Sequence, residues 1–186
     1  LSTMKAADKV TNRVLLRNHY RCGKRIINFN NQYFYHNKLV VSPSLEEGNV
    51  SFIDSDNHVR TLVKNQNYEE AKNVVSYCKK NDISDCAIIT PFVNQAKLIN
   101  DLLIKNGVKE VKAATIHSVQ GAEKNTIIIA TGVSSFTSPR TIKWLNSHGE
   151  IANVAVSRAK KKLVVFGDEE KLKNTKTGDS VWNELI

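Results

Sequence analysis

Cysteine is scarce in this sequence, and its scarcity limits what the chain can be. Only three occur among 186 residues, Cys22, Cys78 and Cys86, and no pair has the Cys-x-x-Cys spacing. This small, odd number argues against a disulfide framework or a zinc site and favours a reducing, cytoplasmic setting. No apolar run approaches the roughly 20 residues that cross a bilayer, so we expect no membrane partner. No internal repeat and no linker rich in proline, glycine or serine interrupts the chain, which favours a single domain.

Acidic residues are outnumbered by basic ones, 18 against 27, and the net charge is +9. Such a balance favours a polyanionic partner, although charge alone fits a well-solvated surface equally well. An apolar content of 41% is that of a globular chain with a sizeable core. We expect the polar residues 1–14 to form a poorly packed segment or linker and residues 15–186 to form the domain. Because the chain opens with Leu1, we also expect the natural protein to extend upstream.

Apolar residues follow two periods that alternate along the chain. Helical spacing predicts a helix after residues 18–21, a helix from Asn67 through Cys78, and a helix with Pro91 in its first turn that runs to Ile104. The short β-rich runs predict strands at Val50–Asp54, Cys86–Thr90, Val111–Thr115, Thr126–Ala130 and Leu163–Phe166. We expect residues 149–160 to be helical and to carry Arg158. Strands that alternate with helices predict a three-layer α/β fold with a mainly parallel central sheet.

Polar clusters follow three of the predicted strands, at residues 90–95, 115–124 and 167–168. Ligands of open parallel sheets bind beyond the carboxyl ends of the strands, so these clusters are candidates for a binding site. The second is the richest, because it offers hydroxyl groups, an amide side chain and the backbone amides near Gly121. Such groups suit phosphate contacts that do not read bases.

Four segments, in order, carry a resemblance to a known family. They are His19-Tyr20-Arg21 with the apolar positions that follow it, Ile89-Thr90-Pro91-Phe92 with Gln95, residues 111–124, and residues 153–160. These segments resemble motifs IV to VI of superfamily 1 helicases, in the branch that contains the nonsense-mediated-decay and Dna2-type helicases. Residues 50–54 and 67–71 also match this branch, and the resemblance spans residues 15–167.

The resemblance implies that the chain is the C-terminal, second RecA-like domain of an ATP-dependent DNA or RNA helicase. The sequence contains no G-x-x-x-x-G-K-[ST] P-loop and no Asp-Glu pair placed to hold Mg²⁺. ATP with Mg²⁺ would therefore bind against an N-terminal RecA-like domain of the same parent chain, which would hold the metal ligands. The isolated chain would then be inactive, because it holds half of a catalytic site.

The matched motifs also imply roles for single residues. Arg158 would be the arginine finger and Arg21 would contact the γ-phosphate. Glu123 would bind near the nucleotide ribose, while Gln120 and Gly121 would couple the two sites. Single-stranded nucleic acid, either DNA or RNA, would be contacted by four residues: Thr90, Pro91, Thr115 and His117. The chain departs from the family at His19, where Gln or Asn is usual, and at Ser157, where Thr is common.

Plainer interpretations compete with each of these roles. Arg158 could cap a helix, Arg21 could form a structural ion pair, and the two threonines could bond to nearby backbone groups. For Trp144 and Trp182, core packing and packing against the missing half are both open. A competing function is a non-catalytic nucleic-acid-binding or partner-docking module with a degenerate helicase fold. The basic charge and the missing P-loop favour it, whereas the intact Arg21, Glu123 and Arg158 argue against it.

Overall fold

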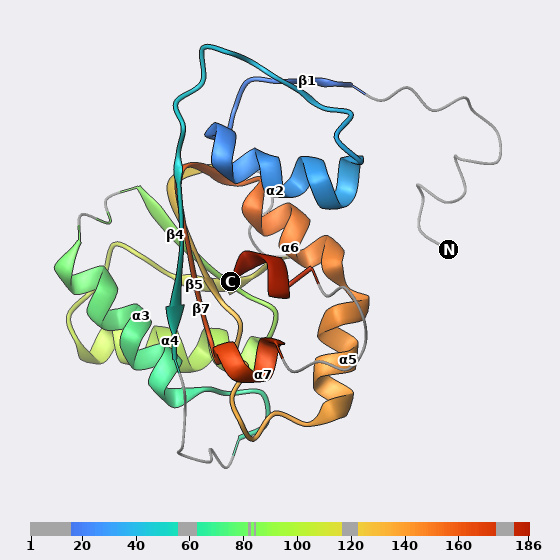
Figure 1. Cartoon of the computed structure of the whole chain (residues 1–186). Helices are drawn as coiled ribbons and strands as arrows, with labels where there is room; N and C mark the ends of the chain where they lie inside the picture. The colour runs from blue at the N-terminus through green and yellow to red at the C-terminus, as the bar shows by residue number, and fades with distance from the viewer. Residues whose placement is uncertain (1–15, 56–62, 82, 84, 117–122, 174–180) are drawn as a thin grey trace, which may run out of the picture.

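A five-stranded parallel sheet forms the centre of the computed structural model, which describes residues 16–55, 63–81, 83, 85–116, 123–173 and 181–186 (Figure 1). The order is β3-β7-β6-β4-β5, and all neighbouring pairs are parallel. Its strands are β3 (Asn49–Asp54), β4 (Cys86–Thr90), β5 (Ala113–Thr115), β6 (Lys124–Ala130) and β7 (Ala159–Gly167). Separately, β1 (Asn18–His19) pairs with β2 (Val40–Val41).

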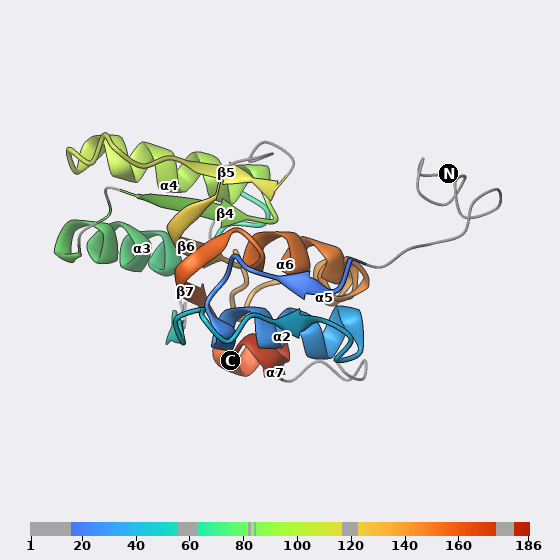
Figure 2. The same cartoon turned by 90° about the horizontal axis from the view of Figure 1, so that it is seen from above.

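Helices cover both faces of this sheet, as Figures 1 and 2 show. One face is covered by α3 (Tyr68–Lys80) and α4 (Val93–Lys105). The other carries α2 (Lys24–Tyr35), α5 (Pro139–Ser147), α6 (Gly149–Val156), α7 (Glu169–Lys173) and the 3₁₀ helix η2 (Asn183–Leu185). The predicted three-layer α/β fold is confirmed.

Alternation along β6 explains why the core has two halves. Ile127 and Ile129 pack toward α2, α5 and α6, whereas Ile128 and Ala130 pack toward α3 and α4. Successive side chains of a strand point to opposite faces, so a continuous apolar run is required where both faces are covered. Trp182, 1% exposed, belongs to the first half, and its indole N–H donates to the carbonyl of Leu145 over 3.1 Å. Of the two interpretations left open for Trp182, core packing is the correct one.

Three local expectations need correction. Pro91 precedes α4, because Phe92 is the N-cap and the helix begins at Val93. The strand expected from Val111 begins only at Ala113, where pairing with β4 starts. Arg158 is not on a helix: α6 ends at Val156, and Arg158 lies in the turn that leads into β7.

The two edges of the sheet are the frame on which the candidate site is built. We call the end where the strands begin the amino edge and the end where they finish the carboxyl edge. Thr115 ends β5 at the carboxyl edge, level with Thr90 of β4, whereas Glu123 and Lys124 stand at the start of β6, at the amino edge. Parallel strands all start at the same edge of the sheet, so Thr115 and Glu123 lie at opposite edges. The sequence suggested that residues 115–124 form one polar cluster at the carboxyl edge, and this expectation is wrong.

In the part of the chain that the structure describes, no helix has the length and apolar character that a membrane span requires.

Candidate functional site

A hollow of about 760 Å³ lies at the amino edge, beside the turn between β1 and α2. We call it the Arg21 hollow. Its polar lining includes His19, Arg21, Glu123, Ser157 and Lys160, which come from three separate segments of the chain. Tyr20, next to Arg21, also lines the hollow and is 70% exposed. The motif resemblance contained Tyr20 but assigned it no role.

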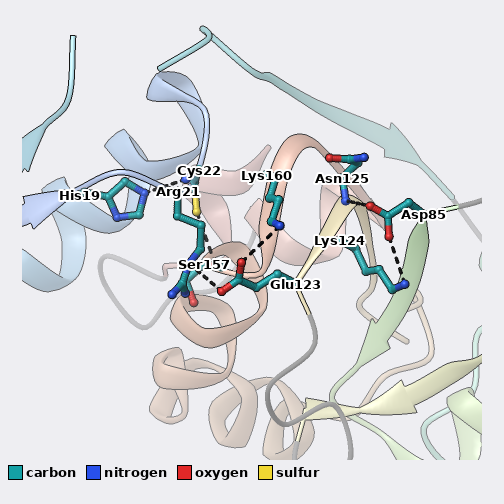
Figure 3. A network of polar contacts seen from close by, with 9 residues as sticks. All are labelled: His19, Arg21, Cys22, Asp85, Glu123, Lys124, Asn125, Ser157 and Lys160. Carbon is teal, nitrogen blue, oxygen red and sulfur yellow. Dashed lines mark hydrogen bonds and ion pairs between the residues drawn. The ribbon is translucent and has the colours of Figure 1, made fainter. Parts of the chain in front are cut away.

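Glu123 joins two cations in this hollow (Figure 3). Its Oε1 is 2.8 Å from Nε of Arg21, and its Oε2 is 3.5 Å from Nζ of Lys160. The Arg21 side chain is half exposed, so this ion pair contributes little to stability. One carboxylate between two cations leaves a net positive charge, which favours an anionic ligand. The structure thus brings together Arg21 and Glu123, two residues that the sequence analysis had assigned to the nucleotide site.

Hydrogen bonds of the His19–Gly23 turn hold Arg21 beside the start of β7. The Cys22 amide donates to Nε2 of His19 over 2.8 Å, and the Cys22 thiol donates to the Ser157 carbonyl over 3.4 Å. The Gly23 amide donates to the Lys160 carbonyl over 2.8 Å. His19 therefore supplies the acceptor for the Cys22 amide in this turn.

The ionisation of His19 and Cys22 fits this positioning role. Burial, followed by the nearby positive charge of Arg21, lowers the pKa of His19 and favours the neutral ring that can accept from Cys22. Burial raises the pKa of Cys22 to about 11, so its thiol stays protonated and donates. The same shift argues against a nucleophilic role for Cys22, because the thiolate is the reactive form.

A second ion pair, also at the amino edge, links the segment before β4 to the start of β6 (Figure 3). Asp85, just before β4, accepts from the Asn125 amide over 3.0 Å and lies 3.0 Å from Nζ of Lys124. The Asn125 hydrogen bond and then Lys124 lower the pKa of Asp85. These contacts keep the starts of β4 and β6 level, and therefore keep Glu123 at the rim of the Arg21 hollow.

Arg158 lies in a different hollow, of about 440 Å³, which we call the Arg158 hollow. Its other lining residues are Ile116, Trp144, His148, Glu150, Ile151 and Val154. Within the described residues, Nε of Arg158 is buried and makes no hydrogen bond. Its chain neighbours Ser157 and Lys160 line the Arg21 hollow, so the backbone of Arg158 lies between the two hollows. The structure does not bring Arg158 and Arg21 into one hollow.

The residues expected to contact nucleic acid lie in different environments. Thr90 is fully buried, and its hydroxyl accepts a hydrogen bond from the Phe92 amide over 3.3 Å. Its side chain therefore bonds to a nearby backbone group, as the competing interpretation expected. Thr115 is half buried at the end of β5. Pro91 lines a surface groove. His117, Gln120 and Gly121 lie outside the described residues.

This groove, the Pro91 groove, has a volume of about 580 Å³ at the carboxyl edge. Its polar and basic lining consists of Lys64, Asn65, Asn94, Arg140 and Thr141, and its apolar lining of Pro91, Phe92, Val93 and Trp144. Sequence reasoning found residues 91–94, which belong to the polar cluster at residues 90–95. It missed the rest of the lining, because Lys64, Arg140 and Trp144 belong to segments that are distant from Pro91 along the chain. No motif marks them.

A buried network of hydrogen bonds around Glu70 lies behind the Phe92 wall of this groove. Glu70 of α3 is fully buried and accepts hydrogen bonds from Gln95, from the Thr131 hydroxyl and from the Gly132 amide. Gly132 has a φ of +68°, and a Cβ there would lie 2.8 Å from the Phe92 ring. Only glycine fits both conditions without displacement. The network thus fixes Gln95 and Gly132 directly behind Phe92.

The chain is thus a three-layer parallel α/β domain with a cationic hollow at one edge of its sheet and a basic groove at the other. Residues 2–170 match the family described as AAA domain, so the chain belongs to that family. It is the C-terminal RecA-like domain of the superfamily 1 helicase class, as the motifs indicated.

Similar proteins agree with this assignment. The chain is 28% identical, over 92% of its length, to an uncharacterized ATP-dependent helicase of Methanocaldococcus jannaschii, and spans 28% of that protein. Over 48% of its length it is 33% identical to the DNA replication ATP-dependent helicase/nuclease DNA2 of Mus musculus, spanning 8% of it. It is 31% identical to human RNA helicase Mov10l1 over 55% of its length, spanning 9% of that protein.

A solved structure is similar in fold. It is the C-terminal domain of a possible DNA helicase from Lactobacillus plantarum, with a TM-score of 0.53 and 15% identity, over 80% of this chain and 87% of that one.

Proposed function

We propose that the chain is the second motor domain of an ATP-dependent helicase that moves along single-stranded DNA or RNA. The observation that carries this proposal is the Arg21–Glu123–Lys160 cluster, which lies at the amino edge in a hollow of about 760 Å³ and carries excess positive charge. The similar proteins, all named helicases, support it. The chain spans only part of each, so the activity belongs to the parent protein.

The residues of the Arg21 hollow fit a nucleoside triphosphate. Arg21 and Lys160 would neutralise phosphate oxygens, and Glu123 would accept from a ribose hydroxyl. ATP supplies the phosphoanhydride whose hydrolysis drives the motor. In the described part of the chain no cluster of three or more His, Cys, Asp or Glu side chains could hold a metal ion. The ligands of Mg²⁺ would therefore come from an N-terminal RecA-like domain that closes over the hollow.

Arg158 would act as the arginine finger after a change of side-chain rotamer. Its backbone lies between Ser157 and Lys160, which already line the Arg21 hollow, and this position supports the proposal that its long side chain would turn into that hollow. An arginine that reaches a transferring phosphate accelerates hydrolysis by about 10³–10⁵.

The Pro91 groove would hold the nucleic acid. Lys64 and Arg140 would contact phosphates, with Asn94 as a further donor and Thr115 along the same edge. Because Thr90 is buried, its contribution would be to hold the Phe92 amide at the groove. Binding through phosphates is expected to be independent of base sequence and to weaken steeply with salt. The three cysteines are free and buried, which fits a reducing, cytoplasmic site of action.

The test is ATP turnover by the full-length protein, with and without a single-stranded oligonucleotide, for wild type, Arg158→Ala and Arg25→Ala. Arg25 is a surface arginine that pairs with Glu47 and lines neither the Arg21 hollow nor the Arg158 hollow. We expect stimulated turnover in wild type and Arg25→Ala, and a loss of at least about 10³-fold in Arg158→Ala with ATP binding retained. Wild-type turnover in Arg158→Ala would refute the finger assignment. Oligonucleotide binding without any turnover would favour the non-catalytic module.

A further inference from the structure

Trp144 lies in the wall between the Pro91 groove and the Arg158 hollow. Of the described residues, Trp144 is the one that lines both the Pro91 groove at the carboxyl edge and the Arg158 hollow. The side chain is 38% exposed, unlike the buried Trp182. The sequence offered no motif that could explain Trp144.

Three rings form a row through this wall. The Phe92 and Trp144 rings lie 5.6 Å apart at an angle of 39°, and the Trp144 and His148 rings are stacked at 4.6 Å and 28°. Phe92 lines the Pro91 groove, whereas His148 lines the Arg158 hollow. Nδ1 of His148 also donates to the Trp144 carbonyl over 2.7 Å, which fastens the end of α5 to the start of α6. The row therefore passes from the groove to the helix that ends beside Arg158.

The same contacts argue against a base-stacking role for Trp144. A base would need an open ring face, but His148 is stacked on the indole and Phe92 packs against it. The basic side chains of the groove, Lys64 and Arg140, suit phosphates instead. What Trp144 can do is respond to whatever occupies the groove, because it forms part of the groove wall.

On the far side of this wall, Arg158 is withdrawn from the Arg21 hollow. Its Nε is buried without a hydrogen bond among the described residues, an unfavourable arrangement for a guanidinium. A small displacement of Trp144 and His148 would change the space that holds the Arg158 side chain, since both residues line that space. Because the Trp144 and His148 rings are stacked at 4.6 Å, a displacement of Trp144 would move His148 with it.

Given the helicase function proposed above, we propose that Trp144 is the positioning residue through which occupancy of the Pro91 groove releases Arg158 toward the Arg21 hollow. A phosphate strand bound by Lys64 and Arg140 presses on Trp144, the stacked His148 moves with it, and the Arg158 hollow changes shape. ATP turnover then depends on nucleic acid because the finger is withheld until the groove is filled. Allosteric coupling of this kind usually amounts to 5–150-fold.

The first experiment measures coupling apart from binding. Full-length wild type, Trp144→Leu, Trp144→Phe and Phe136→Leu are compared for oligonucleotide affinity and for the ratio of ATP turnover with saturating oligonucleotide to turnover without it. Phe136 is a matched control, because it is a half-exposed aromatic residue in the loop before α5 that is absent from both linings. We expect the ratio to fall at least about fivefold in Trp144→Leu, with affinity within about twofold, and to recover in Trp144→Phe. The ratio should be unchanged in Phe136→Leu.

A second readout requires no ATP. The difference in fluorescence between wild type and Trp144→Phe isolates the Trp144 indole, and its quenching by acrylamide should change when a saturating oligo(dT) binds. Unchanged quenching with oligonucleotide bound would overturn the proposal, as would a wild-type turnover ratio in Trp144→Leu. A loss of affinity that fully explains the lower ratio would also overturn it. If wild type itself binds no oligonucleotide or shows no stimulated turnover, the helicase function fails instead.

Discussion

Replacement of Glu70 tests the buried network that supports the Pro91 groove. The Glu70 side chain is fully buried, and hydrogen bonds of 2.8–3.1 Å reach its two oxygens from Gln95, Thr131 and the Gly132 amide. None of these hydrogen-bond donors carries a positive charge. Desolvation by burial therefore outweighs the hydrogen bonds and raises the pKa of Glu70 to about 8. We expect the folded protein to hold Glu70 neutral near neutral pH.

This shift makes stability depend on pH with a definite sign. The folded-state pKa lies above the ordinary value of 4.5, so the stabilisation is complete below that value and is lost as the pH rises toward 8. Each pH unit inside the window corresponds to about 1.4 kcal/mol. Between about pH 5.5 and about pH 7.5, the free energy of unfolding should fall by roughly 2–3 kcal/mol more in wild type than in Glu70→Gln. Glutamine has a similar shape and cannot ionise.

The assay is urea unfolding of wild type, Glu70→Gln and Glu69→Gln, followed by circular dichroism at several pH values. Glu69 is the matched control, because it stands on the same turn of α3 but is partly exposed and paired with Lys72. Its variant should follow the wild-type pH profile. If wild type and Glu70→Gln give parallel profiles, Glu70 is ionised in the folded protein, and the reasoning from burial is wrong.

Two further outcomes are expected. Protonation of His19 removes the acceptor of the Cys22 amide; burial and then Arg21 lower its folded-state pKa below 6.5. The free energy of unfolding of wild type should therefore fall as the pH drops from 6.5 toward that lower value. In urea unfolding, the free energy of His19→Gln should depend less on pH over this range, and equal slopes for the two proteins would contradict the role of His19. Trp182→Ala should lower the free energy of unfolding by about 3–5 kcal/mol, because it removes a core ring together with the hydrogen bond from the indole to the Leu145 carbonyl. Phe136→Ala, at a half-exposed position, should change it by less than about 1 kcal/mol, and similar losses in both variants would refute the core assignment of Trp182.

Local sequence patterns were sufficient for the architecture. The apolar run at β6 predicted a central strand because both faces of such a strand must be buried, and the helical spacing before residue 35 predicted α2. Asn67 was predicted to open a helix, and its side chain caps α3 by accepting from the Glu70 amide. Arg21 and Glu123 were found through short motifs, although about 100 residues separate them.

Only the tertiary structure decided how these residues face one another. The sequence by itself determined the three-layer fold, the family and the motif residues, because each depends on neighbours within a few positions. It could not show that Thr90 is buried or that Arg21 and Arg158 occupy different hollows. Nor could it show that Trp144 separates the Pro91 groove from the Arg158 hollow while Trp182 lies in the core. Those facts depend on the edge of the sheet at which each residue lies and on the side chains that distant segments of the chain place beside it. A periodic pattern specifies the buried face of an element but not the residues of other elements that pack against it.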